Sequence, residues 1–322
     1  MYRLVEIILP KENKENLKDI FNTKGIVDYW QEESYKDKLA YKILIQTPFS
    51  QTLIDKLRKI KNIRIIVTEV ITTIPEIEKS TPPKKKIKVS REELYAQTLN
   101  SSSINYVYII MIILSAIIAI FGFSTDNIAV IIGAMVIAPL LGPNIAAALG
   151  ITLGDMSLVK KGFLALLTGS SLAYFISVFF GFFLHISLNL HEISLRIHLH
   201  YSDIIIAIAS GIAGVLAFTT GYAISLVGVM VAISLLPPLV ASGLLFGSGY
   251  FLYSLSALLL FFINVVSLIL SGVITFRFQG IRPKTWWEEK KAKIYRKQAI
   301  TMSLIMLLLF IVAIFINHKI FH

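Results

Sequence analysis

The stretch IIGAMVIAPLLGPNIAAALGITLGD, residues Ile131–Asp155, decides the fold. It is apolar and long enough to cross a bilayer, which takes about 20 such residues. Pro139, Gly142 and Pro143 interrupt it near the middle. Proline removes a backbone donor and clashes with the preceding helical turn. Carbonyl groups freed in this way cannot face hydrocarbon, so they must face protein or water. The stretch therefore predicts a membrane span that is broken at a sheltered position.

A second stretch repeats this pattern at a fixed offset of 95 residues. The residues that match at that offset include Gly133, Met135, Val136, Leu140, Leu141, Pro143, Ala146 and Gly154, which correspond to Gly228, Met230, Val231, Leu235, Leu236, Pro238, Ala241 and Gly249. Pro237 and Pro238 interrupt this second stretch as well. A repeat of three crossings must invert its topology. Parallel repeats with re-entrant hairpins would place Lys160 and Lys161 outside, so single crossings and inverted halves are favoured.

Seven apolar stretches have about the length that a transmembrane helix needs. They are Ile104–Phe123, Asn127–Gly150, Phe163–Leu184, Asp203–Thr219, Tyr222–Phe246, Tyr250–Phe276 and Ala299–Asn317. The sequence is 55% hydrophobic and only 16% charged, whereas soluble domains are nearer a quarter charged. The expected body, residues 104–317, is a polytopic α-helical membrane domain with an inverted 3+3 repeat and one extra helix.

The basic residues predict the orientation of this domain. They precede the first span at Lys84–Arg91, follow the second at Lys160 and Lys161, and follow the sixth at Arg277–Lys297. The opposite side holds only Arg196 and Lys319. Because positive residues accumulate in cytoplasmic loops, we expect a cell-membrane protein with a cytoplasmic N-terminal domain and an outer C-terminus. The net charge of +11 is explained by these flanking residues and by anionic lipid, and nucleic-acid binding is not expected.

Residues 1–78 form a soluble head in the order βαββαβ. Strands are expected at Tyr2–Leu9, Ile26–Glu33, Leu39–Gln46 and Ile63–Ile74, with helices at Lys11–Thr23 and Ser50–Lys59. This order is the α+β ferredoxin-like arrangement. Such heads often oligomerise or bind small regulators, so a homo-oligomer is expected by fold analogy. Residues 79–103, with Pro82 and Pro83, read as a linker and a short interfacial helix at Arg91–Leu99.

Two matched, interrupted spans in inverted halves indicate a transport site near the bilayer midplane. The candidate pathway residues are Pro139, Gly142, Pro143, Asn144, Leu236, Pro237, Pro238 and Asn264. Ordinary proline kinks that shape packing are the alternative for the breaks. Asn144 and Asn264 could equally form hydrogen bonds between helices.

Several kinds of chemistry have no support in the sequence. There is no cysteine, and we find no catalytic motif and no paired carboxylates at depth, so neither an enzyme nor a cofactor is expected. His185, His191, His198 and His200 cluster between the third and fourth spans without metal-ligand spacing. Asp126 and Asp203 stand at outer helix starts and suit N-caps, and Asp155 is expected to be solvated at the interface.

The stretch Ile131–Asp155 resembles the family described as domain of unknown function 389, most specifically in GAMVIAPLLGP at Gly133–Pro143. REELY at Arg91–Tyr95 and SGIAG at Ser210–Gly214, within Asp203–Gly221, are similar to the same family. The resemblance covers nearly the whole chain. It implies a cytoplasmic head and a hydrophobic multi-span domain, and it assigns no substrate and no residue role.

The first hypothesis is a transporter or channel for a small solute or ion, whose path runs between the two interrupted spans. The alternative is a membrane-anchored sensor or scaffold whose head binds a regulatory ligand or partner. Flux through a reconstituted bilayer would favour the first. Tight ligand binding by the head, without a polar cavity in the body, would favour the second.

Overall fold

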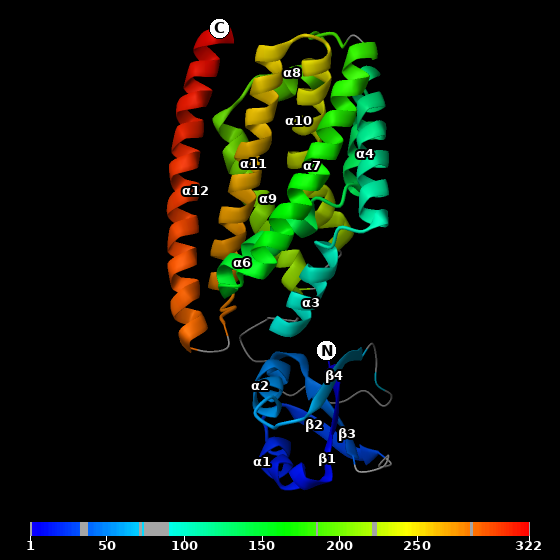
Figure 1. Cartoon of the computed structure of the whole chain (residues 1–322), viewed down its shortest axis with the longest axis vertical. Helices are drawn as coiled ribbons and strands as arrows, with labels where there is room; N and C mark the ends of the chain where they lie inside the picture. The colour runs from blue at the N-terminus through cyan, green and yellow to red at the C-terminus, as the bar shows by residue number, and fades with distance from the viewer. Residues whose placement is uncertain are drawn as a thin grey trace. The chain divides into compact units, whose positions relative to one another are not determined.

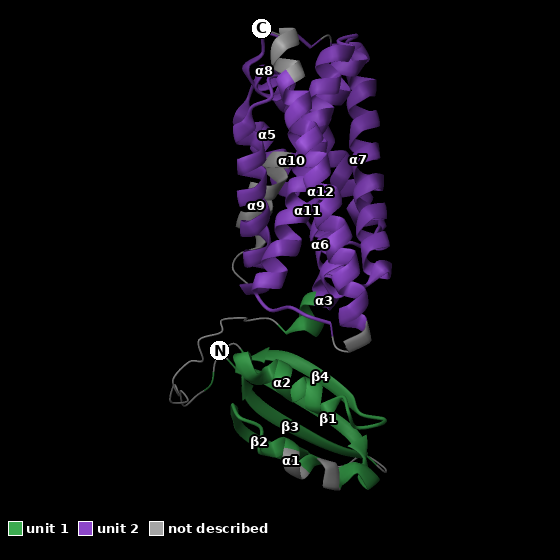
Figure 2. Ribbon diagram, turned by 90° about the vertical axis from the view of Figure 1, so that its left-hand side faces the viewer, with its two compact units in different colours: residues 1–94 green, residues 95–322 purple. Residues whose placement is uncertain are grey.

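The computed structural model describes residues 2–32, 38–70, 73, 90–184, 186–220, 224–283 and 286–321. The chain divides into two compact units, residues 1–94 and 95–322, which are coloured separately in Figure 2. The first unit contains a small antiparallel sheet, and the second is helical. Most of the expected linker, residues 79–89, lies outside the described residues.

The first unit is built on a four-stranded sheet. Its elements are β1 (Tyr2–Pro10), the 3-10 helix η1 (Lys11–Leu17), α1 (Lys18–Phe21), β2 (Ile26–Glu32), β3 (Lys38–Gln46), α2 (Thr47–Leu57) and β4 (Arg64–Val70). The strands lie in the order β2-β3-β1-β4, and each neighbouring pair is antiparallel. The long central strands β1 and β3 therefore hold the sheet together, while β2 and β4 form its edges.

Alternation along the strands places the core of this unit on one face of the sheet. Val5 and Ile7 of β1 and Ile43 of β3 are fully buried, and they belong to the same cluster as Leu53 and Leu57 of α2. Because side chains on a strand alternate between the two faces, the intervening residues of β1 and β3 face the other way. That second face carries no helix of this unit among the described elements.

The expected helix at Lys11–Thr23 is two shorter pieces, η1 and α1, and α2 begins earlier than expected, at Thr47. Pro48 lies in the first turn of α2. Backbone N–H groups in the first turn of a helix have no partner within the helix, so proline costs no hydrogen bond there. The strand expected at Ile63–Ile74 is described from Arg64 to Val70, and Ile71, Thr72 and Ile74 lie outside the described residues.

The second unit is a bundle of long helices. Helix α3 (Arg91–Ser101) crosses the boundary between the units, and the remaining helices are α4 (Tyr106–Ser124), α5 (Ile128–Ile137), α6 (Leu141–Leu153), α7 (Met156–Leu184), α8 (His191–Ile197), α9 (Tyr201–Thr220), α10 (Ile224–Gly247), α11 (Phe251–Phe278) and α12 (Trp286–Phe321). Figure 1 shows them in chain order by colour.

The helices of this bundle have the length and composition of membrane spans. Within the described part of the chain, five of them can cross a bilayer, or six if α5 and α6 count as one bent span. Residues Leu235–Gly247 of α10 form a shorter apolar helix. The long apolar helices indicate a multi-pass membrane protein. The seventh expected span corresponds to α10, and whether α10 crosses the membrane stays a prediction.

The spans differ in how deeply they are buried. In α11, 72% of the most apolar window is buried within the bundle, whereas in α12 the share is 11%. Helix α11 therefore lies at the centre. Helix α12 lies at the side, as Figure 1 shows, with most of its apolar surface left for lipid.

Two helices in this unit begin earlier than the sequence predicts, and one further helix was not expected. Helix α12 begins at Trp286 instead of Ala299, and α7 begins at Met156 instead of Phe163. Hydropathy marks only the part of a helix that lies in oil, and charged residues do not end a helix outside it. The short helix α8 has too few apolar residues to register as a span and was not expected.

Candidate functional site

The first matched span is bent where the sequence places its prolines. Helix α5 ends at Ile137 and α6 begins at Leu141, with an angle of 51° between them. Ala138 adopts an extended conformation, with φ −66° and ψ 118°. A residue before proline avoids the helical region, so Pro139 accounts for this conformation. Pro143 lies in the first turn of α6, where proline is tolerated.

The second matched span is not interrupted, and the expectation of a broken helix there is wrong. Helix α10 runs continuously from Ile224 to Gly247 with Pro237 and Pro238 inside it. A proline within a helix removes one hydrogen bond and often only kinks the helix. Here a proline pair follows Leu236 directly. In the first span Pro139 and Pro143 stand apart and flank Gly142, which gives the chain room to turn.

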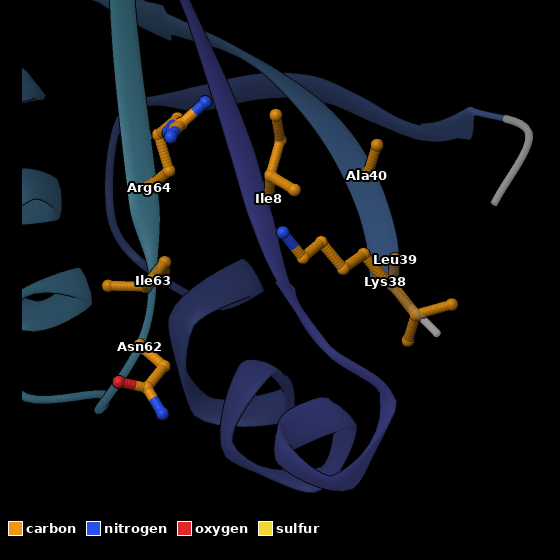
Figure 3. A pocket seen from close by; sticks show the side chains of 7 residues that line it. All are labelled: Ile8, Lys38, Leu39, Ala40, Asn62, Ile63 and Arg64. Carbon is orange, nitrogen blue, oxygen red and sulfur yellow. The ribbon is translucent and has the colours of Figure 1, made fainter. Parts of the chain in front are cut away.

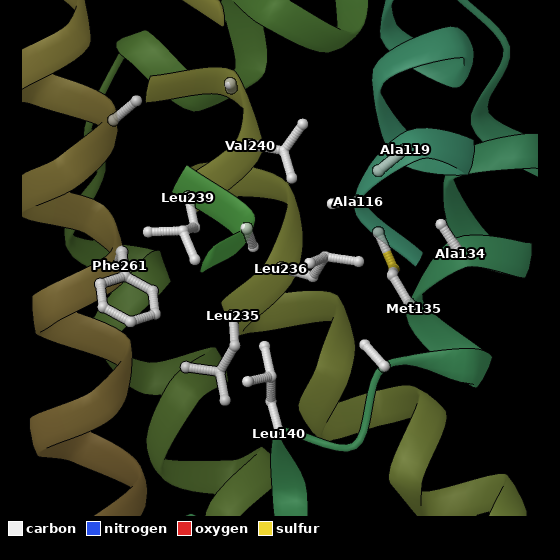
Figure 4. Close-up of a cluster of buried hydrophobic side chains, with 14 of the residues drawn as sticks. Ala116, Ala119, Ala134, Met135, Leu140, Leu235, Leu236, Leu239, Val240 and Phe261 are labelled. Carbon is white, nitrogen blue, oxygen red and sulfur yellow. The ribbon is translucent and has the colours of Figure 1, made fainter. Parts of the chain in front are cut away.

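The structure brings the two proline segments together. Leu140, at the bend, belongs to the same buried cluster as Leu235, Leu236 and Leu239 of α10. Figure 4 shows these side chains filling the space between the segments, with Phe261 of α11 beside them. The described side chains at this meeting point are apolar, so the segments make a dry contact in this conformation.

The candidate pathway residues are almost all buried. Gly142, Pro143, Asn144, Leu236, Pro237, Pro238 and Asn264 are buried, and Pro139 is half-buried. Asn144 donates its Nδ2 hydrogen to the carbonyl of Leu140 at 2.9 Å. This bond fixes the orientation of the amide, because a carbonyl can only accept. The Oδ1 atom of Asn144 then points away as an acceptor.

Two buried oxygens in this region have no hydrogen-bond partner among the described residues: Oδ1 of Asn144 and Oγ of Ser267. Such an atom costs about 1–3 kcal/mol when left unsatisfied. Ser267 lies on α11, three residues after Asn264 and thus near the same face. Sequence reasoning missed Ser267, although its spacing from Asn264 would have found it.

Helices α6 and α11 bring these two oxygens to a similar depth. A Cβ on Gly272 of α11 would lie 2.9 Å from Cβ of Ala148 of α6, so the helices touch there. Helix α11 runs antiparallel to α10, because the two are joined by a short turn across which Oγ of Ser242 donates to the carbonyl of Ser254 at 2.8 Å. Helix α6 also runs antiparallel to α10, as the contacts of α7 establish. About one helical turn before Ala148 on α6 lies Asn144, and about one turn before Gly272 on α11 lies Ser267.

Close backbone contacts fix the direction of α10 relative to α7. A Cβ on Gly243 would meet Ser177 and the carbonyl of Tyr174, and a Cβ on Gly247 would meet Val178 and Gly181. The later glycine of α10 contacts the later residues of α7, so α7 and α10 are parallel. Helix α6 is antiparallel to α7, because the two are joined by a tight turn at Gly154. The matched segments α6 and α10 therefore run in opposite directions.

Glycines around the bend allow the helices to pack closely. A Cβ on Gly162 of α7 would lie 2.7 Å from the carbonyl of Pro143, and one on Gly142 would collide with the carbonyl of Ser101 in α3. Small residues let helices approach closely in a membrane. Helices α3 and α7 thus hold the first turn of α6 from two sides.

Loops at both ends of the helices use acidic residues as helix caps. Asp126 accepts from the backbone N–H groups of Glu192, at 2.9 Å, and His191, at 3.1 Å, so it caps α8 and not its own helix. These N–H groups lower the pKa of Asp126. Asp155 accepts from Ser157 N and thereby caps α7, so it is not simply solvated. Asp203 accepts from His200 N.

The described histidines form no metal-binding group with acidic residues, and His185 lies outside the described residues.

A known protein is similar to this chain over nearly its whole length. The family model described as a domain of unknown function, DUF389, matches residues 135–270, which include both proline segments. An uncharacterized protein of Methanocaldococcus jannaschii is 37% identical over 304 residues, covering 93% of this chain and 94% of that protein. No solved structure matches the chain. The chain belongs to the DUF389 family of proteins.

Proposed function

We propose that this protein is a membrane transporter or channel for a small solute or ion, with its central site beside the bend between α5 and α6. The observation that carries the proposal is Oδ1 of Asn144, a buried acceptor without a partner among the described residues. Polar atoms at depth in a membrane are costly and usually mark a path or a ligand. An acceptor oxygen suits a cation or a hydrogen-bond donor.

An inverted repeat supports this site. The turn after α6 and the turn after α10 have matching hydrogen bonds: Asp155 N to Gly150 O and Tyr250 N to Leu245 O, each at 2.9 Å. Gly154 and Gly249, at the same offset of 95 residues, both have positive φ, at 73° and 86°. Because the matched helices run in opposite directions, the two halves relate as inverted copies. Sites in such proteins lie where the halves meet.

The dry contact between the proline segments belongs to a closed conformation of the pathway. Leu140 on one side and Leu236 and Leu239 on the other would have to separate before a solute could pass. These side chains are flexible and apolar, so their separation breaks no hydrogen bond. The two segments would then expose backbone carbonyls that proline leaves without a helical donor.

We also assign the head to the ferredoxin-like arrangement, which the strand order β2-β3-β1-β4 and the antiparallel pairing support. The distribution of Lys and Arg supports a cytoplasmic position for this head.

Tracer uptake into liposomes that contain the full chain tests the proposed function. The panel includes Na⁺, K⁺, chloride, amino acids and organic acids. The wild type is expected to carry at least one of them. Asn144→Leu removes the free acceptor and is expected to reduce this flux at least tenfold, if the hydrogen bond it supplies is worth about 1.4 kcal/mol in the rate-limiting state.

Ser115→Ala is the matched control. Ser115 is a fully buried membrane hydroxyl, but it donates to the carbonyl of Ile112 in its own helix at 2.9 Å. Its loss should leave the flux unchanged. Absence of flux for the whole panel, or equal losses in Asn144→Leu and Ser115→Ala, would contradict the proposal.

A further inference from the structure

The head has a hollow on the face of its sheet that the helices leave open. Its volume is about 550 Å³, within the range of about 300–1,000 Å³ typical of small-molecule sites. Strands β1, β3 and β4 line it side by side, because Ile8 pairs with Ala40 on one side and with Arg64 on the other. Figure 3 shows Ile8 between Lys38 and Arg64. The hollow therefore lies at one end of three adjacent strands.

Two cations flank this hollow without an acidic partner. Among the described residues, neither Lys38 nor Arg64 forms an ion pair or a side-chain hydrogen bond, and both are exposed. Their charges are thus available to a ligand. Figure 3 shows the Lys38 side chain extending from β3 toward β1, so its charge is directed over the floor of the hollow.

The acidic residues described on the same face are engaged elsewhere. Glu32 forms an ion pair with Lys42, and Glu6 pairs with Lys42 across β1 and β3. The hydrogen bond that Lys42 donates to Glu32, followed by the negative charges of Glu32 and Glu6, raises the pKa of Lys42. Lys42 thus offsets part of the negative charge of Glu6 and Glu32. The end of the face that holds Lys38 and Arg64 adds two positive charges, and these favour an anion.

The floor of the hollow is apolar. Ile8, Ala40 and Ile63 contribute to it, and Asn62 adds a polar amide at its rim. Asn62 has a φ of 58°, the left-handed conformation that asparagine tolerates better than most residues. A hollow with cations at its edge and an apolar floor matches a ligand with one anionic end and one flat apolar part.

We propose that this hollow binds a nucleotide-sized organic phosphate, with Arg64 and Lys38 holding the phosphate and Ile8 and Ala40 contacting the base. Arginine suits this role because its planar fork can bond two phosphate oxygens at once. The proposal is independent of solute transport, because it concerns the first unit alone. Phosphate is also present in lipid headgroups, so the test separates these sources.

Equilibrium dialysis of the full chain in a nonionic detergent tests this site. The probes are ATP, AMP, adenosine, inorganic phosphate and glycerol 3-phosphate, the last standing for a lipid headgroup. ATP or AMP is expected to bind at least tenfold more tightly than adenosine, inorganic phosphate or glycerol 3-phosphate. Binding is expected to weaken as salt rises, because ions screen exposed charges.

Arg64→Gln is expected to weaken nucleotide binding about tenfold or more, and Ala40→Phe to weaken it similarly by filling the floor without changing the charge. Lys59→Gln removes the same charge from an exposed position outside the hollow and should bind as the wild type does. Thermal unfolding of each variant verifies that the fold is intact.

Three results would overturn the proposal. The first is no binding of ATP or AMP by the wild type at about 1 mM, the weak end of useful affinity. The second is equal binding by Arg64→Gln and Lys59→Gln. The third is binding of adenosine, inorganic phosphate or glycerol 3-phosphate as tight as that of the nucleotides.

Discussion

Arg296 is a buried cation where α12 meets the end of α6. Its Nη1 donates to the carbonyl of Thr152 at 2.9 Å, and its Nη2 pairs with Glu289 at 2.9 Å. The last carbonyls of a helix lack helical donors and carry partial negative charge. Arg296 therefore caps α6. Sequence reasoning placed it only among the positive residues of the inner side, because nothing local distinguishes it from Lys297.

Arg296→Met is expected to destabilise the protein by about 1–3 kcal/mol, because it removes a cap and leaves a buried carbonyl unpaired. Lys297→Met removes the same charge from the exposed neighbouring position and should change stability little. Thermal unfolding in detergent measures both. Equal unfolding temperatures for the two variants would show that Arg296 acts only through its charge.

Tyr95 makes the stability of the contact between α3 and the start of α7 depend on alkaline pH. Its hydroxyl donates to Oδ2 of Asp155 at 2.8 Å, and burial, followed by this bond to a carboxylate, raises the pKa of Tyr95. The folded protein thus holds the proton more tightly than the unfolded chain. This contribution is complete below the unfolded pKa of about 10 and is lost as pH rises through the folded pKa.

Tyr95→Phe should therefore lower the unfolding temperature at pH 7, by the equivalent of about 1 kcal/mol. The difference between the variant and the wild type should shrink as the pH is raised above 10. Unfolding scans from pH 7 to 11 measure it. A constant difference across this range would mean that the hydroxyl proton does not contribute.

At the scale of elements, the interface between α7 and α10 depends on glycine. A Cβ on Gly181 would collide with the carbonyl of Leu244, whereas a Cβ on Gly133 of α5 would meet nothing within 4 Å. Gly181→Ala is expected to cost about 1–3 kcal/mol from overpacking. Gly133→Ala should be neutral or stabilising by up to about 1 kcal/mol, because alanine favours helices. Thermal unfolding compares the two. A loss in Gly133→Ala as large as that in Gly181→Ala would contradict the contact geometry.

The elements show where sequence reasoning ends. Apolar length located the spans, because oil selects apolar side chains directly. The bend at Pro139 was predicted, since Ala138 had to leave the helical region. The continuity of α10 was not, because whether a helix tolerates Pro237 and Pro238 depends on its neighbours. The spacing from Asn264 could have identified Ser267, but its relation to Asn144 exists only once α6 and α11 pack together.

At the scale of the whole molecule, the absence of cysteine makes the predicted orientation directly testable. A cysteine placed at Lys161 or at Asn189 would be the only thiol in the chain, and both positions are exposed. In intact cells, a membrane-impermeant maleimide should label Asn189→Cys but not Lys161→Cys. Permeabilised cells should label both and serve as the control. The reverse pattern in intact cells would place the head outside.

Charge and hydropathy predict the outcome of that labelling test. The separation of the two units, in contrast, is a property of the folded chain. Leu94, within a motif that sequence reasoning treated as one interfacial helix, marks the end of the first unit, and Tyr95 begins the second. A boundary inside a continuous helix leaves no mark in composition, since helical periodicity runs through it. Only the packing of each half against its own unit reveals it.

One chain here holds two related segments in different shapes: α5 and α6 bend by 51°, and α10 does not break. Were the two shapes exchanged, the composition would stay the same and the bend would move to the other matched segment, which runs in the opposite direction. For a carrier, these two forms would face opposite compartments. The asymmetry between the matched segments would then be what distinguishes loading from release.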